Sequence, residues 1–332
     1  MRRGLAINVP LILALTVGPA AGCALLGDRQ GEADAIASRI KSLPGVANAR
    51  AEYKSNFTAG EHFELSSSLS RDATPAQAAD VARTFVTAAD TAGFESANSA
   101  ALILEYPAQA RRNYDLHTTS SAKIDYTRTS VSTLPEPAQA AARAATWLQA
   151  AQSPIAEYVD AGWRDDGASV TVNLRPQATA EQARALQQAV PGLARAEWVI
   201  NIIRDERNRP NSYESTPTPP ADDIIALWTR LSDAVGPYGH ISGSTAPTGK
   251  NRPVPTELEA ELPDGRGSEP DQLRIPPELA ELAKGFGHPV KLTTRGGVGA
   301  VQIIVGGCHP RDPKDKPPTA LQQSMSAQFE KC

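Results

Sequence analysis

The chain is poor in the residues that mark several specialised protein classes. Of its 332 residues only 5% are aromatic and three are cysteine, while 41% are hydrophobic and 21% are charged. Three cysteines are too few for a disulfide-built scaffold, and the apolar fraction is enough for two or three modest domains with hydrophobic cores. The formal net charge of −4 excludes a generally basic surface of the kind that attracts nucleic acid. We therefore expect no nucleic-acid partner.

The familiar catalytic and metal-binding motifs are missing as well. The sequence has no G-x-S-x-G, H-E-x-x-H or EF-hand pattern, and its five histidines are scattered: His62, His117, His240, His288 and His309. An S-x-x-K pattern runs from Ser120 to Lys123 among strand-forming residues, where alternation would place the two side chains on opposite faces. The glycine-rich run 295–299 precedes a strand pattern rather than a helix, which favours a hairpin turn over a phosphate loop. We predict no catalytic residue, no cofactor and no metal.

Four tryptophans are candidates for stacking against the sugar rings of an envelope polysaccharide. Trp147, Trp198 and Trp228 fall on apolar stripes and are predicted to be core residues. Trp163 lies in a polar segment typical of a turn, so it is the one tryptophan kept as a candidate contact residue. The alternative for Trp163 is packing over a neighbouring strand edge.

The amino terminus has the pattern of an export signal. Arg2 and Arg3 precede an apolar run at 11–17, which is shorter than the roughly 20 residues of a transmembrane helix. The small residues Ala20-Ala21-Gly22 then lead to Cys23, an order that resembles the lipobox of bacterial lipoproteins. The Ala-, Arg- and Pro-rich composition is similar to that of actinobacterial envelope lipoproteins.

This resemblance implies that Cys23 receives diacylglycerol, with acyl chains such as palmitate, and becomes the first residue of the mature chain. The protein would then be lipid-anchored to the cell membrane on its extracytoplasmic face. An ordinary secretory signal that leaves Cys23 as a spare thiol is the alternative.

Export also changes the charge and the interpretation of the other two cysteines. Removal of residues 1–22 takes Arg2 and Arg3 from the 33 basic residues, which leaves 31 against 37 acidic ones and a net charge of −6. Outside the cytoplasm, Cys308 and Cys332 are a natural disulfide pair that would fasten the end of the chain. A metal site formed by Cys308, His309 and Cys332 is the alternative.

Hydrophobic periodicity predicts an α+β fold made of tandem αββαβ units. A helix pattern at 34–43, strand patterns at 46–55 and 62–68, a second helix from 75 and a strand at 101–106 form the first unit. The same order recurs from 137 to 203, and Ala73-Thr74-x-x-Gln77-Ala78 is echoed 105 residues later by Ala178-Thr179-x-x-Gln182-Ala183. With a further strand from 114–131, the second unit would be a ferredoxin-like split βαβ sandwich, with antiparallel sheets and helices on one face.

These patterns divide the chain into a lipoprotein signal peptide at 1–22, a tether at 23–33, a first repeat with extra strands at 34–131 and a second repeat at 132–207. A Pro-rich linker at 208–220 and a C-terminal α+β region at 221–332 follow, and a degenerate third repeat is one interpretation of that region. The expected function is that of a non-catalytic interaction module of the cell envelope. Its partners would be the membrane, through lipid on Cys23, and an unidentified envelope protein or the cell wall. A carrier of an apolar ligand or lipid, and an envelope enzyme with dispersed active-site residues, are the alternatives.

Overall fold

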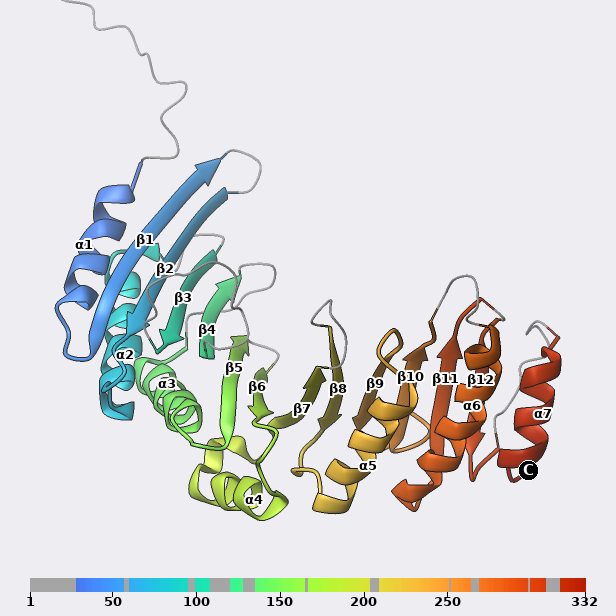
Figure 1. Cartoon of the computed structure of the whole chain (residues 1–332). Coiled ribbons are helices and arrows are strands. Elements are labelled where there is room, and N and C mark those ends of the chain that lie inside the picture. The colour runs from blue at the N-terminus through green and yellow to red at the C-terminus, as the bar shows by residue number, and fades with distance from the viewer. Residues whose placement is uncertain are drawn as a thin grey trace, which may run out of the picture.

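The computed structural model describes residues 28–56, 60–94, 99–107, 120–127, 135–164, 167–203, 209–250, 252–263, 269–297, 299–308 and 317–332. In these ranges the chain forms seven α-helices and one 12-stranded mixed sheet (Figure 1). The α+β fold class predicted from the sequence is confirmed. No helix in the described ranges is long and apolar enough to cross a membrane.

The chain repeats one small unit, a helix followed by a β-hairpin, six times before it ends with a seventh helix. The first two units are α1 (Gln30–Lys41), β1 (Val46–Asn56) and β2 (Gly60–Leu69), then α2 (Pro75–Thr91), β3 (Ser99–Tyr106) and β4 (Ser120–Thr127). The third and fourth are α3 (Pro137–Ala151), β5 (Ala156–Arg164) and β6 (Gly167–Leu174), then α4 (Ala180–Ala189), β7 (Glu197–Ile203) and β8 (Pro210–Ser215). The fifth and sixth are α5 (Asp222–Ala234), β9 (His240–Thr245) and β10 (Thr256–Glu261), then α6 (Glu269–Ala283), β11 (Val290–Arg295) and β12 (Val301–Val305). The terminal helix is α7 (Ala320–Phe329), and short 3-10 turns follow α4 and α6 at Pro191–Leu193 and Lys284–Phe286.

The strands lie in the sheet in the order in which they occur in the chain. The two strands of each hairpin pair antiparallel, and strands joined by a helix pair parallel, as in β2–β3 and β6–β7. The prediction of antiparallel sheets is therefore wrong for the strand pairs that a helix joins, because each helical crossover returns the chain in the direction of the preceding strand. The αββ unit is also about half of the predicted αββαβ unit, and the sheet continues from unit to unit instead of closing into separate sandwiches.

The repeated helix starts predicted from the sequence have a structural basis. The hydroxyl of Thr74 accepts from the backbone N–H of Gln77, whose side chain accepts from the N–H of Thr74, and Thr179 and Gln182 form the same capping box on α4. The two boxes lie two αββ units apart. A matching irregularity in strand register occurs near the start of β1 and of β5, the first strands of the first and third units. At α7, Thr319 again accepts from the N–H of Gln322.

Three predicted boundaries are corrected. The expected linker at 208–220 contains β8, which is paired on both sides, so the sheet runs through it. The expected tether at 23–33 overlaps α1, which begins at Gln30. The expected single C-terminal region at 221–332 divides into two further αββ units and the terminal helix α7.

The core lies between the helices and one face of the sheet. Trp147, Trp198 and Trp228 are each 0% exposed, which confirms that these tryptophans are core residues. Near the amino terminus the Phe63 ring stacks on Phe85 and Phe94, with centroid distances of 5.6 and 4.3 Å. Burial of such aromatic and aliphatic side chains is the main stabilising contribution.

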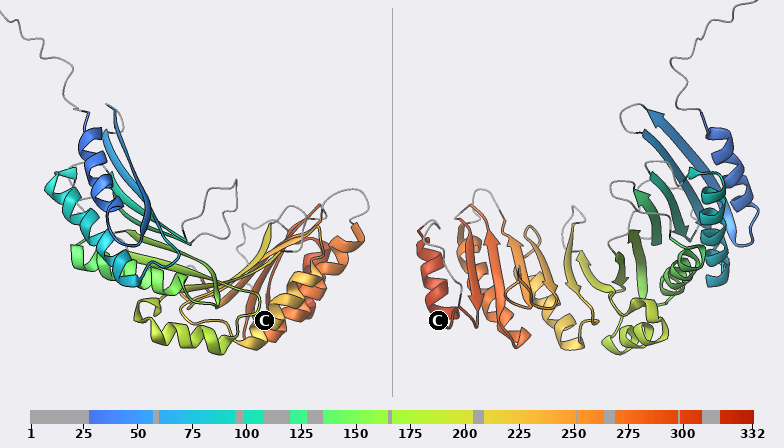
Figure 2. Two further views of the ribbon diagram at one scale, coloured as in Figure 1. Left: turned by 60° about the vertical axis from the view of Figure 1, so that its left-hand side comes forward. Right: turned by 180° about the vertical axis from the view of Figure 1, so that it is seen from behind.

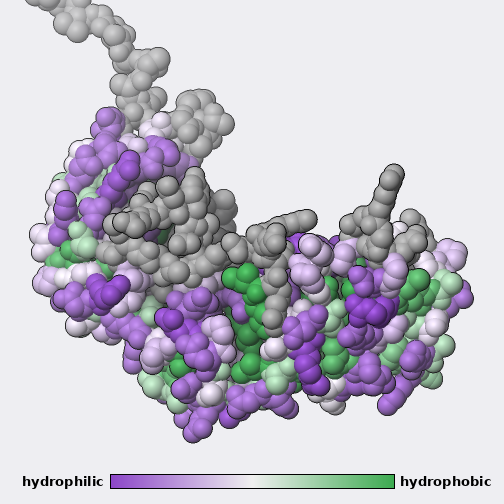
Figure 3. Space-filling model, viewed as in Figure 1, coloured by the Kyte–Doolittle hydropathy of each residue, from purple (hydrophilic) through white to green (hydrophobic). Residues whose placement is uncertain are grey.

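The whole molecule is an open arc. All helices lie on its outer, convex side, and the opposite face of the sheet lines the inside (Figure 2). Hydrophilic side chains dominate the outer surface of the helix layer, with apolar residues in scattered patches (Figure 3). Arrays of stacked repeats commonly use such a concave surface for binding.

Candidate binding surface

The sheet face that carries no helices is called here the concave face. Along each strand, side chains alternate between the helix-covered core and this face, as on β10, where Thr256, Leu258 and Ala260 are buried. The residues between them, Glu257 and Glu259, are half-buried on the concave face. Polar residues thus occupy the positions that a sandwich fold would cover with a second layer.

The strand register arranges concave-face side chains in rows that cross the sheet. One row crosses eight strands, and each of its members lies opposite the next: Tyr158, Asn173, Val199, Glu214, Ser244, Glu257, Lys291 and Ile304. A parallel row on the next side-chain level crosses β7 to β12: Asn201, Ser212, Ser242, Glu259, Thr293 and Gln302. Hydroxyl, amide and carboxylate groups make up most of both rows.

The concave face is strongly acidic. With β4 and Arg164 of β5 left out, because their side chains lie outside the described part, the concave strand positions hold four cations against nine carboxylates, a net charge of −5. The cations are Arg50, Lys54, Lys291 and Arg295, and the carboxylates are Glu52, Glu64, Glu105, Asp160, Glu197, Glu214, Glu257, Glu259 and Glu261.

Three of the carboxylates in the C-terminal half are neutralised by cations. The pairs are Glu257 with Lys291 at 3.5 Å, Glu259 with Arg295 at 3.0 Å, and Glu261 with Arg209 at 2.7 Å. The hydrogen bond from Arg209 lowers the pKa of Glu261. These pairs hold the β10 side chains in place across the neighbouring strands.

Glu197 and Glu214 differ, because neither forms an ion pair with any described residue. Glu197 of β7 is two residues from Val199, which lies opposite Glu214 on β8, so the carboxylates are diagonal neighbours on one face. Burial raises the pKa of Glu197, and the like charge of Glu214 adds to the rise. No described cation pairs with either carboxylate, so within the described part of the chain their negative charge is uncompensated.

A hollow of about 220 Å³ opens on the concave face beside Glu214. Its lining comes from four strands, β8 to β11, and contains Glu214, Ser242, Ser244, Glu257, Glu259, Lys291 and Thr293 with Gly243 and Leu258 at its floor. The guanidinium of Arg252 donates to the Ser244 hydroxyl at 3.0 Å and fixes one wall. A side chain of a ligand fits this volume, but a large cofactor does not.

A ladder of amide and hydroxyl groups adjoins the hollow. Asn201 donates from Nδ2 to Oδ1 of Asn173 at 2.9 Å, and the Ser212 hydroxyl donates to Oδ1 of Asn201 at 2.7 Å. These bonds link β6, β7 and β8 on the concave face. The ladder fixes the polar side chains, so they present an ordered surface.

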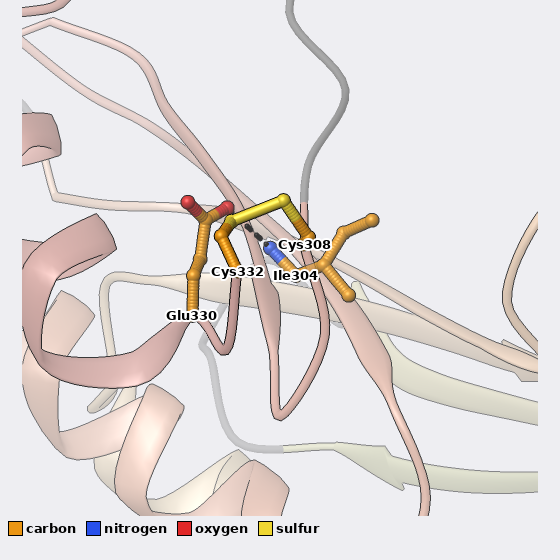
Figure 4. Close-up of a disulfide and its surroundings, with 4 residues drawn as sticks. All are labelled: Ile304, Cys308, Glu330 and Cys332. Atoms are coloured by element: carbon orange, nitrogen blue, oxygen red, sulfur yellow. Dashed lines mark hydrogen bonds between the residues drawn. A yellow bond between two sulfur atoms is a disulfide. The ribbon is translucent and has the colours of Figure 1, made fainter.

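The last strand of the sheet is capped, which leaves little of its edge open. The backbone N–H of Ile304 donates to the Glu330 carboxylate at 3.1 Å, and the Gln322 amide donates to the carbonyl of Gln302 at 3.1 Å. The disulfide Cys308–Cys332, with its Cα atoms 4.8 Å apart, joins the chain end to the residues that follow β12 (Figure 4). The predicted pairing of these cysteines is confirmed, and it fixes a cap that prevents edge-to-edge association.

The other predicted residues are not brought together. Cys23, His117 and His309 lie outside the described residues. Trp163 lies within β5 rather than in a turn, so that prediction is wrong for its backbone, and its side chain is not described. Ser120 and Lys123 lie in β4, as the strand prediction required, and the glycine run after Arg295 joins β11 to β12 as an antiparallel hairpin.

The described histidines serve separate local contacts. His240 contacts the carbonyl of Pro210 at 3.0 Å, whereas Nε2 of His288 lies 2.8 Å from the Thr256 hydroxyl on the core side of the sheet. His62 is on β2, distant in the strand order from both. Among the described residues, no group of three or more His, Cys, Asp or Glu side chains is arranged to hold a metal ion.

Comparison with known proteins gives no relative: no protein-family model, no curated protein and no solved structure matches the chain. The sequence did contain a signal for the concave face, because Thr256-Glu-Leu-Glu-Ala-Glu261 alternates acidic and core residues with period two.

Proposed function

We propose that the protein is a membrane-anchored, extracytoplasmic binding module whose concave face takes up a partner in the cell envelope. The observation that carries this proposal is the open face of the 12-stranded sheet, which carries mostly polar side chains, while every helix of the described ranges lies on the other side.

The lipid anchor rests on the order Ala20-Ala21-Gly22-Cys23. Several acyl chains on Cys23 would hold the protein stably, since each buried methylene contributes about 0.8 kcal/mol. Metabolic labelling with a fatty acid is expected to mark the wild type and not Cys23→Ala. Label that persists in the variant would contradict lipidation at this residue.

The binding role is tested by blocking the concave face in cells that lack the native protein. Ser242→Tyr with Thr293→Tyr places two large side chains in the hollow on β9 and β11. Arg184→Tyr with Gln188→Tyr, on the exposed side of α4, is the matched control. We expect loss of complementation only for the concave pair, at unchanged protein level and circular dichroism.

The same strains separate binding from catalysis. Ser120→Ala, Lys123→Ala and single histidine substitutions are expected to complement fully, because a binding module does not depend on one nucleophile or base. Loss of function from one of these changes at normal protein level would favour an enzyme. Lipid that remains bound to the purified native protein in mass spectrometry would favour a carrier.

A further inference from the structure

The concave face has the charge and shape to hold one particular class of partner. The described concave positions carry a net charge of −5, whereas several charges on the helices form local pairs, such as Arg83 with Asp80 and Lys284 with Glu281. Between β7 and β12, the concave-face carboxylates that form no ion pair with a described residue are those of Glu197 and Glu214. Glu214 lines the hollow, and Glu197 is its diagonal neighbour.

We propose that the concave face binds an extended, cationic polypeptide segment of an envelope protein, with one lysine or arginine side chain of the segment in the hollow beside Glu214. This proposal rests on the binding role proposed above and names its partner. A bound ammonium or guanidinium group would supply the positive charge that Glu197 and Glu214 do not receive from any described residue.

The geometry favours a segment that lies across the strands. The edge of β12 is capped by Glu330 and Gln322, and at the other edge the backbone N–H of Tyr53 on β1 donates to Gln30 of α1 at 3.0 Å. Addition of a partner strand to either edge would have to displace these contacts. The concave rows, by contrast, present hydroxyls and amides that can bond to a peptide backbone between the charged side chains.

The dimensions of the face set the length of the segment. Eight strands, β5 to β12, carry the long row, and strands are spaced about 4.8 Å apart, so the row spans about 34 Å. An extended peptide advances about 3.3 Å per residue, so about ten residues cross this part of the sheet. Neutral glycan is a weaker fit, because Tyr158 is the single aromatic residue among the described concave-face positions.

The probe is a fluorescein-labelled 12-residue peptide of alternating Lys and Ser, and its binding to the full chain with Cys23→Ala is followed by fluorescence anisotropy. Peptides with Gln or Glu in place of Lys are the ligand controls. We expect the Lys peptide to bind at least tenfold more tightly than the Gln peptide, and more weakly as the salt concentration rises.

Two variants locate the binding on the protein. Glu197→Gln with Glu214→Gln is expected to weaken binding of the Lys peptide at least tenfold. Glu181→Gln with Glu281→Gln, which removes the same charge from the exposed faces of α4 and α6, should change it less than twofold. Equal losses in the two variants would show attraction by net charge alone and would overturn the proposal.

Failure of this proposal differs from failure of the binding role. If the Lys peptide binds no better than the Gln peptide while the tyrosine block on β9 and β11 still abolishes complementation, the concave face binds a partner that is not cationic. If a purified neutral cell-wall glycan binds and the Lys peptide does not, the partner is carbohydrate. Either result overturns the cationic segment and leaves the binding role standing.

Discussion

A single added methyl group at Gly243 tests how the sheet and α5 fit together. Gly243 is a buried residue of β9, between Tyr213 on β8 and Leu258 on β10. Trp228 of α5 is completely buried over this position, and its ring nitrogen donates to the carbonyl of Asn211 at 3.3 Å. A glycine in the middle of a strand is normally unfavourable, so a close approach of this kind is the reason to have one.

The size of the effect follows from the contacts that a Cβ atom would make. An ideal Cβ at Gly243 lies 2.8 Å from Cδ2 of Leu258, 2.9 Å from Cζ3 of Trp228 and 3.1 Å from Cδ2 of Tyr213. Overpacking of a core destabilises the folded state by about 1–3 kcal/mol. Replacing glycine by alanine also reduces the conformational entropy of the unfolded chain, which stabilises the protein by about 0.4–1 kcal/mol. Gly243→Ala should therefore lower the free energy of unfolding by about 1–2 kcal/mol.

The matched control is the same substitution at Gly31, an exposed position of α1 where an added Cβ meets nothing within 4 Å. Alanine there should be neutral or stabilise by up to about 1 kcal/mol, because glycine is a poor helix former. Guanidinium chloride unfolding followed by tryptophan fluorescence measures both variants. A Gly243→Ala protein as stable as the wild type would refute the predicted packing of α5 on β9.

Three further predictions concern the cap, the helix starts and the half-buried His288. Replacing Cys308 and Cys332 by Ser should lower the free energy of unfolding by about 3 kcal/mol, the loop-closure contribution of a disulfide at this separation. Hydrogen exchange at the backbone amides of Ile304 and Gly306 should increase, and unchanged exchange would show that the cap holds without the bond. Thr179→Ala removes the hydroxyl that accepts from the N–H of Gln182, so it should lower the free energy of unfolding, measured by chemical denaturation, by about 1 kcal/mol. Thr87→Ala in the middle of α2 should lower it much less, and similar losses in the two variants would argue against the capping box. Burial lowers the pKa of His288 below its ordinary value of 6.5, so the folded state favours the neutral imidazole. The stability that depends on this neutral form is fully present above pH 6.5 and is lost as the pH falls below it. The melting temperature of the wild type should therefore fall more between pH 7 and pH 5 than that of His288→Gln, and parallel profiles would contradict this assignment.

The sequence carries enough information for most helices and strands, because their apolar periodicity is local. The second repeat predicted from residue 137 begins where α3 (Pro137–Ala151) begins, and the two capping boxes appear in the sequence as Thr-x-x-Gln. The predicted core tryptophans also follow from local spacing. What periodicity does not reveal is which strands pair between hairpins, so one continuous sheet was not predicted.

Strand β8 shows why a part of the fold was missed. Its helix-facing positions include Asn211 and Ser215, which are buried polar residues, so the segment has the composition of a linker. In the folded protein Oδ1 of Asn211 accepts from the N–H of Ile241 and its carbonyl accepts from Trp228, while the Ser215 hydroxyl donates to Thr218. These partners are distant in sequence or formed only in the folded turn, so local propensity gives no sign of the strand.

The acidic surface was missed for a related reason. Each glutamate of β7, β8 and β10 is an ordinary solvent-facing strand residue when considered alone. The net charge of −5 arises only because the register aligns many strands with the same face open. The opposite error concerns Trp163. Its neighbours in sequence have the composition of a polar turn, but its place inside β5 depends on pairing with β4 and β6.

Site-specific photo-crosslinking in living cells tests the central claim, that the partner lies against the concave face, most directly. A photoreactive phenylalanine analogue replaces Ser242 or Thr293 on the concave face and, in matched strains, Arg184 or Gln188 on the outside of α4. We expect a discrete adduct of one size from both concave positions and none from the outer ones. Adducts only from α4, or equal adducts from the two faces, would contradict a binding role for the open side of the sheet.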